Sequence, residues 1–230
     1  MPGTSTVHEI VFSLRDFLFP PVCFCCEQPV GDNTVLCVKC IDTLTVESEL
    51  HELPDRKVKG ATFFSVLLPY DDMCRQVVHG LKYHGMSSIG PIMGRLMAIK
   101  TLRLLPRIDH AIILPVPLHP EKLLDRGYNQ CESLAKGFAA FSGYDVRTDV
   151  LKRVRWTETQ TKLTHEERQD NVRNAFQFCS ATSIEGCDII LIDDVLTTGS
   201  TIEACINALM SGGAETITVS VMASPVPGEE

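Results

Sequence analysis

The sequence contains no apolar run that approaches the roughly 18 residues of a membrane-spanning helix, so we expect no membrane span. Residues 1–20 lack the basic stretch and the small-residue cleavage site that mark an export signal, and they contain Glu9 and Asp16. Internal repeats and low-complexity tracts are also missing. Together these absences predict a globular cytoplasmic protein, in which thiols stay reduced.

Positive charge is also scarce. Lysine and arginine number 21 against 29 aspartates and glutamates, which gives a formal net charge of −8. This balance disfavours broad, non-specific binding to nucleic acid, because such binding needs local positive charge. The length of 230 residues allows one sizeable α/β domain and a small additional module.

The most informative segment begins at Cys187 and reads CDIILIDDVLTTGS. Its apolar run 189–192 suits a strand buried on both faces of a parallel sheet, which puts Asp193 and Asp194 at the carboxyl end of that strand. The turn 197–201 opens into a helical pattern, and the start of a helix offers unpaired N–H groups to an anion. The aspartates would repel phosphate, so their natural partners are ribose hydroxyls and a hard cation such as Mg²⁺. The alternative is an ordinary strand end followed by a capped helix.

This segment resembles the phosphoribosyl pyrophosphate (PRPP) binding motif of type I phosphoribosyltransferases, which is an apolar strand, two acids and a TTG-type loop. The resemblance implies that the two aspartates contact the ribose diol and that the loop surrounds the 5′-phosphate. The PRPP-binding residues that it implies are Asp193, Asp194, Val195, Thr197, Thr198, Gly199, Ser200 and Thr201.

A second constellation near the start of the chain has the spacing C-x2-C-x10-C-x2-C. Its members are Cys23, Cys26, Cys37 and Cys40. Two such knuckles match a tetrahedral zinc site, and a closed site with four thiolates is structural. Cys25 is one thiol more than the ion needs, and we treat it as a spare ligand. A pair of disulfides is the alternative, which the missing export signal disfavours. The other cysteines lack metal spacing and are expected to be buried thiols.

Hydrophobic periodicity and the cysteine spacing divide the chain into three parts: an N-terminal amphipathic helix over residues 1–19, a zinc ribbon over 20–46, and a main domain over 60–225. A polar linker over 47–59 separates the last two. Within the main domain the expected strands are residues 61–69, 110–116, 146–150, 176–178, 189–192 and 216–223. The expected helices are residues 71–83, 89–105, 131–141 and 201–210, with a polar loop over 118–130. Strands that alternate with helices predict an α/β fold with a parallel, flavodoxin-like sheet.

Basic side chains follow several of these elements, and we expect them to bind pyrophosphate or to form a lid over it. A stretch rich in cations, residues 152–176, would provide the lid. The candidates for these roles are Lys82, Pro117, His119, Lys122, Arg153, Arg155 and Gln160. The alternatives are a solvated loop and a surface helix whose charges only maintain solubility.

Taken in order, the cysteine knuckles, LKYHG, PVPLHPEKLLDRGYNQ, the Arg153 to Gln160 stretch, NVRNAF and IDDVLTTGST resemble the ComF family. The resemblance runs from about residue 19 to 221. It implies a type I phosphoribosyltransferase-like fold with an N-terminal zinc ribbon and a role in natural transformation, where imported single-stranded DNA is handled. Asp125 departs from the family, which more often has a basic residue there.

Three functions are compatible with these features. The first is a transferase that moves ribose 5-phosphate from PRPP with Mg²⁺, in which Arg126 and Arg168 contact the leaving group and the acceptor is not identified. The second is a factor that binds PRPP and handles single-stranded DNA, with Trp156, Tyr83 or Tyr128 as stacking platforms. The third is an adaptor that docks on a protein partner, such as one of the competence machinery, through its zinc module and N-terminal helix.

Overall fold

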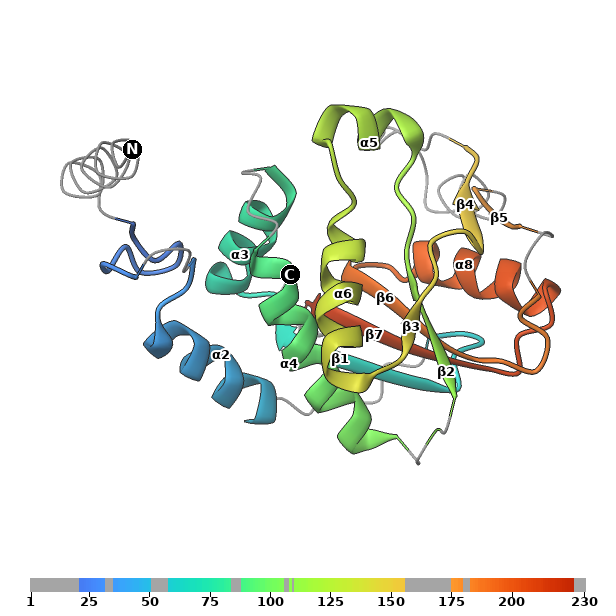
Figure 1. The fold of residues 1–230 in the computed structure, drawn as a ribbon, viewed down its shortest axis with the longest axis horizontal. Helices are drawn as coiled ribbons and strands as arrows, with labels where there is room; N and C mark the ends of the chain where they lie inside the picture. The colour runs from blue at the N-terminus through green and yellow to red at the C-terminus, as the bar shows by residue number, and fades with distance from the viewer. Residues whose placement is uncertain are drawn as a thin grey trace, which may run out of the picture.

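The computed structural model describes residues 21–31, 35–50, 58–83, 88–105, 108, 110–155, 175–179 and 183–225, and for residues 47–50 the backbone alone. Its centre is a sheet of five parallel strands in the spatial order β1-β7-β6-β2-β3. The bounds of these strands are β1 Phe63–Pro69, β2 Ala111–Pro115, β3 Asp145–Val146, β6 Asp188–Val195 and β7 Thr216–Ser224 (Figure 1). The predicted fold class is therefore confirmed.

The strand order reverses between β2 and β6. From β2 the chain moves to β3 on one side and then to β6 on the other. β2 and β6 are parallel neighbours, and Pro115 at the end of β2 pairs with Ile192 of β6. The spatial order β3-β2-β6-β7 corresponds to 2-1-3-4 of the flavodoxin order, and β1 takes the outer position although it comes first in the chain. Ligands of such sheets bind beyond the carboxyl ends of the strands at the reversal point. The topology therefore directs attention to the ends of β2 and β6.

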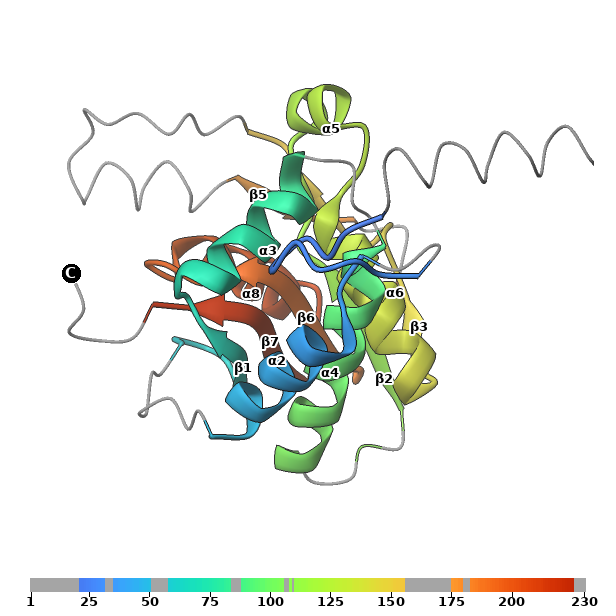
Figure 2. The same cartoon turned by 90° about the vertical axis from the view of Figure 1, so that its left-hand side faces the viewer.

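Helices cover both faces of the sheet (Figure 2). The first face packs against α3 (Asp72–Tyr83), α4 (Ile89–Leu104) and α6 (Gln130–Ser142), and the second against α8 (Ser200–Ser211). Side chains of β6 alternate between these two layers, since Ile190 and Ile192 belong to the first core and Ile189 and Leu191 to the second. A strand buried on both sides explains why the segment reads as a continuous apolar run.

Several elements differ from the sequence-based expectation. The predicted polar loop 118–130 contains a short helix, α5 (Pro120–Arg126), which stands away from the sheet in both views. None of its residues is buried, so no apolar periodicity could mark it. The expected strand 146–150 is replaced by β3 and by β4 (Leu151–Arg153). β4 pairs antiparallel with β5 (Phe176–Phe178) in a separate sheet of two strands.

The boundary between the cysteine knuckles and the linker also differs. Helix α2 (Val38–Leu50) begins inside the second knuckle and extends past the predicted start of the linker at residue 47. The predicted helix over residues 1–19 lies outside the described residues. Among the described helices, none is long and apolar enough to cross a membrane.

Candidate functional site

The acid pair lies inside the last residues of β6 and is almost fully buried, because Asp193 is 8% exposed and Asp194 is 5% exposed. One oxygen of Asp193, Oδ1, accepts the backbone N–H of Asp194 at 2.9 Å and the thiol of Cys131 at 3.3 Å. Asp194 Oδ1 accepts the N–H of Val195 at 2.7 Å. Asp194 Oδ2 accepts the Gln130 amide at 2.9 Å and forms an ion pair with Lys82 Nζ at 2.7 Å. Each carboxylate is therefore held in one orientation.

Burial changes the protonation chemistry of this cluster. Burial, together with the charge of Asp194, raises the pKa of Asp193 to about 7. Burial alone would lower the pKa of Lys82, but the adjacent Asp194 outweighs it and raises that pKa, so the ammonium stays charged. Burial and then the charge of Asp193 raise the pKa of Cys131, which remains a neutral thiol that can donate a hydrogen bond. Carboxylate oxygens suit a hard cation such as Mg²⁺, and in this structure the Lys82 ammonium supplies the positive charge beside Asp194.

Four predicted cations come together beside the acids. Burial lowers the pKa of Lys122, and the positive charges of Arg153, Arg126 and Lys82 lower it further. These side chains belong to α5, β4 and α3, which are far apart in the sequence. Because like charges repel one another, a bound polyanion would stabilise this group of cations.

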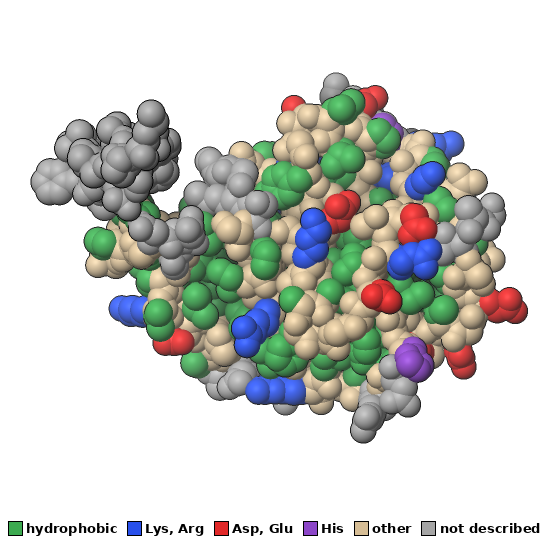
Figure 3. Space-filling view, in the orientation of Figure 1, with side chains coloured by type: hydrophobic (Ala, Val, Ile, Leu, Met, Phe, Trp, Pro, Cys, Tyr) green, Lys and Arg blue, Asp and Glu red, His purple; other side chains and the backbone are tan. Residues whose placement is uncertain are grey.

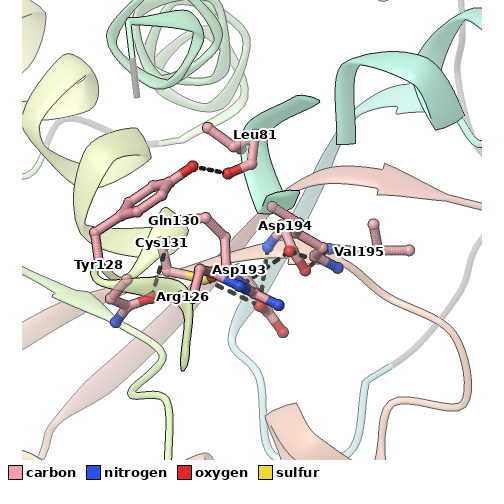
Figure 4. A network of polar contacts seen from close by, with 10 residues as sticks. Leu81, Arg126, Tyr128, Gln130, Cys131, Asp193, Asp194 and Val195 are labelled. Carbon is pink, nitrogen blue, oxygen red and sulfur yellow. Dashed lines mark hydrogen bonds and ion pairs between the residues drawn. The ribbon is translucent and has the colours of Figure 1, made fainter. Parts of the chain in front are cut away.

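The loop between α5 and α6 is tied to the end of α3 by a polar network (Figure 4). Arg126 donates to the Gln130 side chain, and its guanidinium lies 5.3 Å from the centre of the Tyr83 ring. The Tyr128 hydroxyl donates to the Leu81 carbonyl. Gln130 thus joins Arg126, the last residue of α5, to the carboxylate of Asp194.

Gln130 is a site residue that the sequence analysis missed. It is 4% exposed and is the first residue of α6, directly after the N-cap Asn129. The Asn129 amide donates to the Val116 carbonyl at 3.1 Å, which fixes this helix start beyond the end of β2. Asn129 and Gln130 form a polar pair at the start of a helix that follows a buried strand, and this sequence pattern could have indicated Gln130.

The Thr/Gly turn after β6 has the shape that the sequence predicts. Gly199 has a φ of 86°, which favours glycine, and α8 begins at the next residue. The hydroxyls of Thr198 and Ser200 lie 2.9 Å apart, and Thr197 and Thr198 are exposed. The N-cap Gly199 offers no side chain, and the Ser200 N–H reaches the Thr198 hydroxyl only at 3.5 Å. The first N–H groups of this helix therefore remain suited to an anion.

The other predicted site residues occupy different positions. His119 is the N-cap of α5, where its Nδ1 accepts the Glu121 N–H at 3.3 Å, and Pro117 is half-buried in the loop after β2. Arg155 is exposed beyond the end of β4. Gln160 and Arg168 lie outside the described residues.

The cysteine knuckles form a compact set of metal donors. The sulfurs of Cys23, Cys26, Cys37 and Cys40 all lie within 4.8 Å of one another. Burial opposes the ionisation of Cys23, but backbone N–H donors, first that of Cys37 at 3.2 Å, offset it and lower the pKa of Cys23 to about 6. Four sulfurs at this separation fit a tetrahedral zinc ion. Burial raises the pKa of Cys25 to about 11, so that thiol is the poorer ligand.

Sequence comparison finds relatives over most of the chain. The "DNA utilization protein YhgH" of Salmonella typhi is 29% identical over 203 residues, which are 86% of this chain and 82% of that protein. Alignments with several other YhgH proteins span 63% of their length. The "Competence protein F" of Haemophilus influenzae is 35% identical over 108 residues, which are 46% of this chain and 47% of that protein. No protein-family model matches the chain.

Structure comparison finds proteins of phosphoribosyl chemistry at low similarity. The glutamine PRPP amidotransferase of B. subtilis, complexed with ADP and GMP, has a TM-score of 0.42 and 18% identity over 62% of this chain and 30% of that one. The resemblance to known proteins therefore depends on the sequence relatives, which carry competence and DNA-utilization names. These matches confirm the predicted resemblance to the ComF family, since the "Competence protein ComFC" of Bacillus subtilis is also among the relatives.

Proposed function

We propose that this protein binds PRPP, or another phosphoribosyl ligand, with Mg²⁺ beyond the carboxyl ends of β2 and β6. The observation that carries the proposal is the cluster of Lys82, Lys122, Arg126 and Arg153 beside two buried aspartates at the point where the strand order reverses. A ligand with a polyanionic end and a hydroxyl-bearing sugar complements both halves of this arrangement.

Each part of the ligand has a complementary part of the site. The ribose hydroxyls would donate to the carboxylates of Asp193 and Asp194, and the 5′-phosphate would accept from the N–H groups at the start of α8. The pyrophosphate would contact Lys122, Arg126 and, after release from Asp194, Lys82. Asp193 and Asp194 offer the carboxylate oxygens that would hold Mg²⁺, and the ion would neutralise part of the phosphate charge.

We further propose that the phosphoribosyl site serves the handling of single-stranded DNA during DNA uptake. This proposal is supported by relatives whose names refer to competence and DNA utilization. Lys and Arg side chains are interspersed with Asp and Glu on the face in Figure 3, so this face carries no continuous basic tract. Contact with DNA would therefore be confined to local groups of cations rather than spread over the surface.

Transfer of ribose 5-phosphate to an acceptor is the second candidate function. It is favoured by the pairing of β4 with β5, because this pairing holds together the two ends of the segment predicted to form a lid. A lid with fixed ends could cover the ligand and exclude water, as transfer to an acceptor other than water requires. Arg126 and the lid residue Arg168 would then contact the leaving pyrophosphate.

Calorimetric titration with PRPP, ribose 5-phosphate and AMP, each with and without Mg²⁺, tests the ligand assignment. We expect PRPP to bind most tightly, and only with Mg²⁺. The double variant Asp193→Asn/Asp194→Asn should lose this binding and keep its zinc, since the amides accept fewer hydrogen bonds from the ribose hydroxyls. The matched control is Asp42→Asn, at an exposed position on α2. The assignment would be abandoned if none of the three ligands bound, or if the double variant bound PRPP like the wild type.

A further inference from the structure

The metal-binding knuckles contact the end of α3 through one aromatic side chain. Phe24 lies between Cys23 and Cys26, and its ring covers Gly80, where an added Cβ would come within 2.7 Å of the ring Cε1 and 2.8 Å of Cζ. The N–H of Phe24 donates to the Val35 carbonyl at 2.9 Å, which links the first knuckle to the residues that precede the second. Only glycine at position 80 allows this close contact.

The two residues that follow Gly80 connect α3 to the ligand site. Leu81 is fully buried, and its carbonyl accepts the Tyr128 hydroxyl from the loop before α6. Lys82 forms the 2.7 Å ion pair with Asp194. Three consecutive residues of α3 therefore contact the knuckles, the α5–α6 loop and the acid pair. Because a helix rises only about 1.5 Å per residue, a displacement at Gly80 moves Lys82 almost equally.

The knuckles and α3 also share one hydrophobic core. Leu36 is fully buried and Leu44 is 1% exposed, and both belong to the same cluster as Val77 and Leu81. The metal-binding module is thus packed against the main domain rather than tethered to it. A small module with so little core of its own depends on the bound metal for its folded shape.

We propose that Phe24 is a positioning residue that transmits the folded shape of the metal-bound knuckles through Gly80 to Lys82. Zinc binding at the four cysteines then determines how well the acid pair and its cations accept a phosphoribosyl ligand. This inference depends on the proposed function, because its final readout is the binding of PRPP. Phe24 does not touch the ligand, so it acts only through the placement of α3.

The test uses the full-length protein in four forms: the wild type, Phe24→Ala, the conservative Phe24→Leu and the control Val46→Ala. Val46 is 54% exposed on α2, within the same module. Each form is reconstituted to about one zinc per chain, as checked by elemental analysis. The measurements are calorimetric affinity for PRPP with Mg²⁺ and hydrogen exchange at the amides of α3.

We expect Phe24→Ala to bind PRPP roughly five-fold more weakly or worse, with faster exchange at residues 80–83. Phe24→Leu should recover most of the affinity, and Val46→Ala should match the wild type. A zinc-loaded Phe24→Ala protein with wild-type affinity and wild-type exchange would overturn the inference. If the wild type itself fails to bind PRPP, the proposed function is wrong, whereas the exchange rates still decide whether Phe24 holds α3.

A double-mutant cycle separates this route from a general loss of packing. In a Lys82→Gln background, which keeps a hydrogen-bond donor toward Asp194, Phe24→Ala should change PRPP affinity by less than about two-fold. The reason is that the connection through Lys82 is already weakened. An equal loss in both backgrounds would show that Phe24 acts on some other part of the site, contrary to the inference.

Discussion

At the scale of single residues, Gln130 is the side chain whose replacement tests the network most sharply. Its amide N–H donates to Asp194 and its carbonyl oxygen accepts from Arg126. Only a neutral side chain with both a hydrogen-bond donor and an acceptor fits this position. Gln130→Glu would place a third carboxyl group next to two buried aspartates. We expect it to weaken PRPP binding at least ten-fold and to cost about 1–3 kcal/mol of stability.

Calorimetry and urea denaturation of Gln130→Glu provide these two numbers. The matched control is Gln177→Glu, which makes the same change at an exposed position of β5 and should be neutral in both measurements. If Gln130→Glu bound PRPP with wild-type affinity, the assignment of Gln130 to the site would be wrong.

The sequence indicated some site residues and not others, for a physical reason. The acid pair, the Thr/Gly turn and the cysteine knuckles are local patterns, in which the spacing along the chain already fixes the relative positions of the side chains. The hydrogen bond between Gln130 and Asp194 joins residues 64 positions apart, and only the packing of α6 on β6 brings them together. Lys82 was expected to contact pyrophosphate, but its ion pair with Asp194 could not be read from either segment alone.

At the scale of elements, α4 and α6 pack closely against each other. A Cβ at Gly94 would lie 1.9 Å from the Leu134 carbonyl oxygen, and one at Gly137 would lie 2.2 Å from that of Pro91. Both obstacles are backbone atoms, which cannot turn aside as a side chain can. The two helices can therefore approach closely because a glycine of each helix faces the backbone of the other helix.

We predict that Gly94→Ala destabilises the protein by about 3 kcal/mol, although alanine favours helix formation. The control is Gly31→Ala, since a Cβ at Gly31 would meet no atom within 4 Å. Urea denaturation followed by circular dichroism compares the two variants. Equal stability of Gly94→Ala and the wild type would mean that the helices are less closely packed than this structure shows.

The elements themselves were predicted where apolar periodicity or an unbroken apolar run marks them. Helices α3 and α4 and strands β1, β6 and β7 were expected within a few residues of their observed bounds. Helix α5 was missed because no residue in it is buried, so its signal is limited to its ends: His119 as N-cap, Pro120 at the first position, and Gly127 with a φ of 80°. Strand β3, of two residues, is too short to form a pattern.

At the scale of the whole molecule, the alternation of strands and helices predicted the parallel sheet but not the position of each strand. β1 precedes the other strands in the chain and yet pairs with β7, the last one. The cysteine spacing likewise predicted the zinc module as a small additional unit. In the structure, Leu36 and Leu44 of this module belong to the same hydrophobic core as the helices of the main domain. Both facts depend on contacts between distant segments, for which a single sequence has no local signal.

Charge distribution is also a property of the whole molecule, and it governs the proposed contact with single-stranded DNA. A formal net charge of −8 opposes binding, so affinity must come from a few cations at the open edge of the site. Arg153 interacts with Asp193 and is part of the proposed phosphoribosyl site, whereas Arg155 is exposed beyond β4 and is available to a DNA phosphate. We therefore expect Arg155→Glu to weaken binding of a labelled oligonucleotide at least three-fold and to leave PRPP affinity unchanged.

The matched control for this charge reversal is Lys59→Glu, an exposed residue before the amino end of β1 and so at the opposite edge of the sheet from the site. Fluorescence anisotropy over a range of salt concentrations gives the affinities. Wild-type affinity should fall steeply with salt, and the slope should be shallower for Arg155→Glu by about one released ion, because one phosphate contact is lost. An oligonucleotide affinity that ignores salt, or equal losses in the two variants, would place any DNA contact away from the edge that carries Arg155.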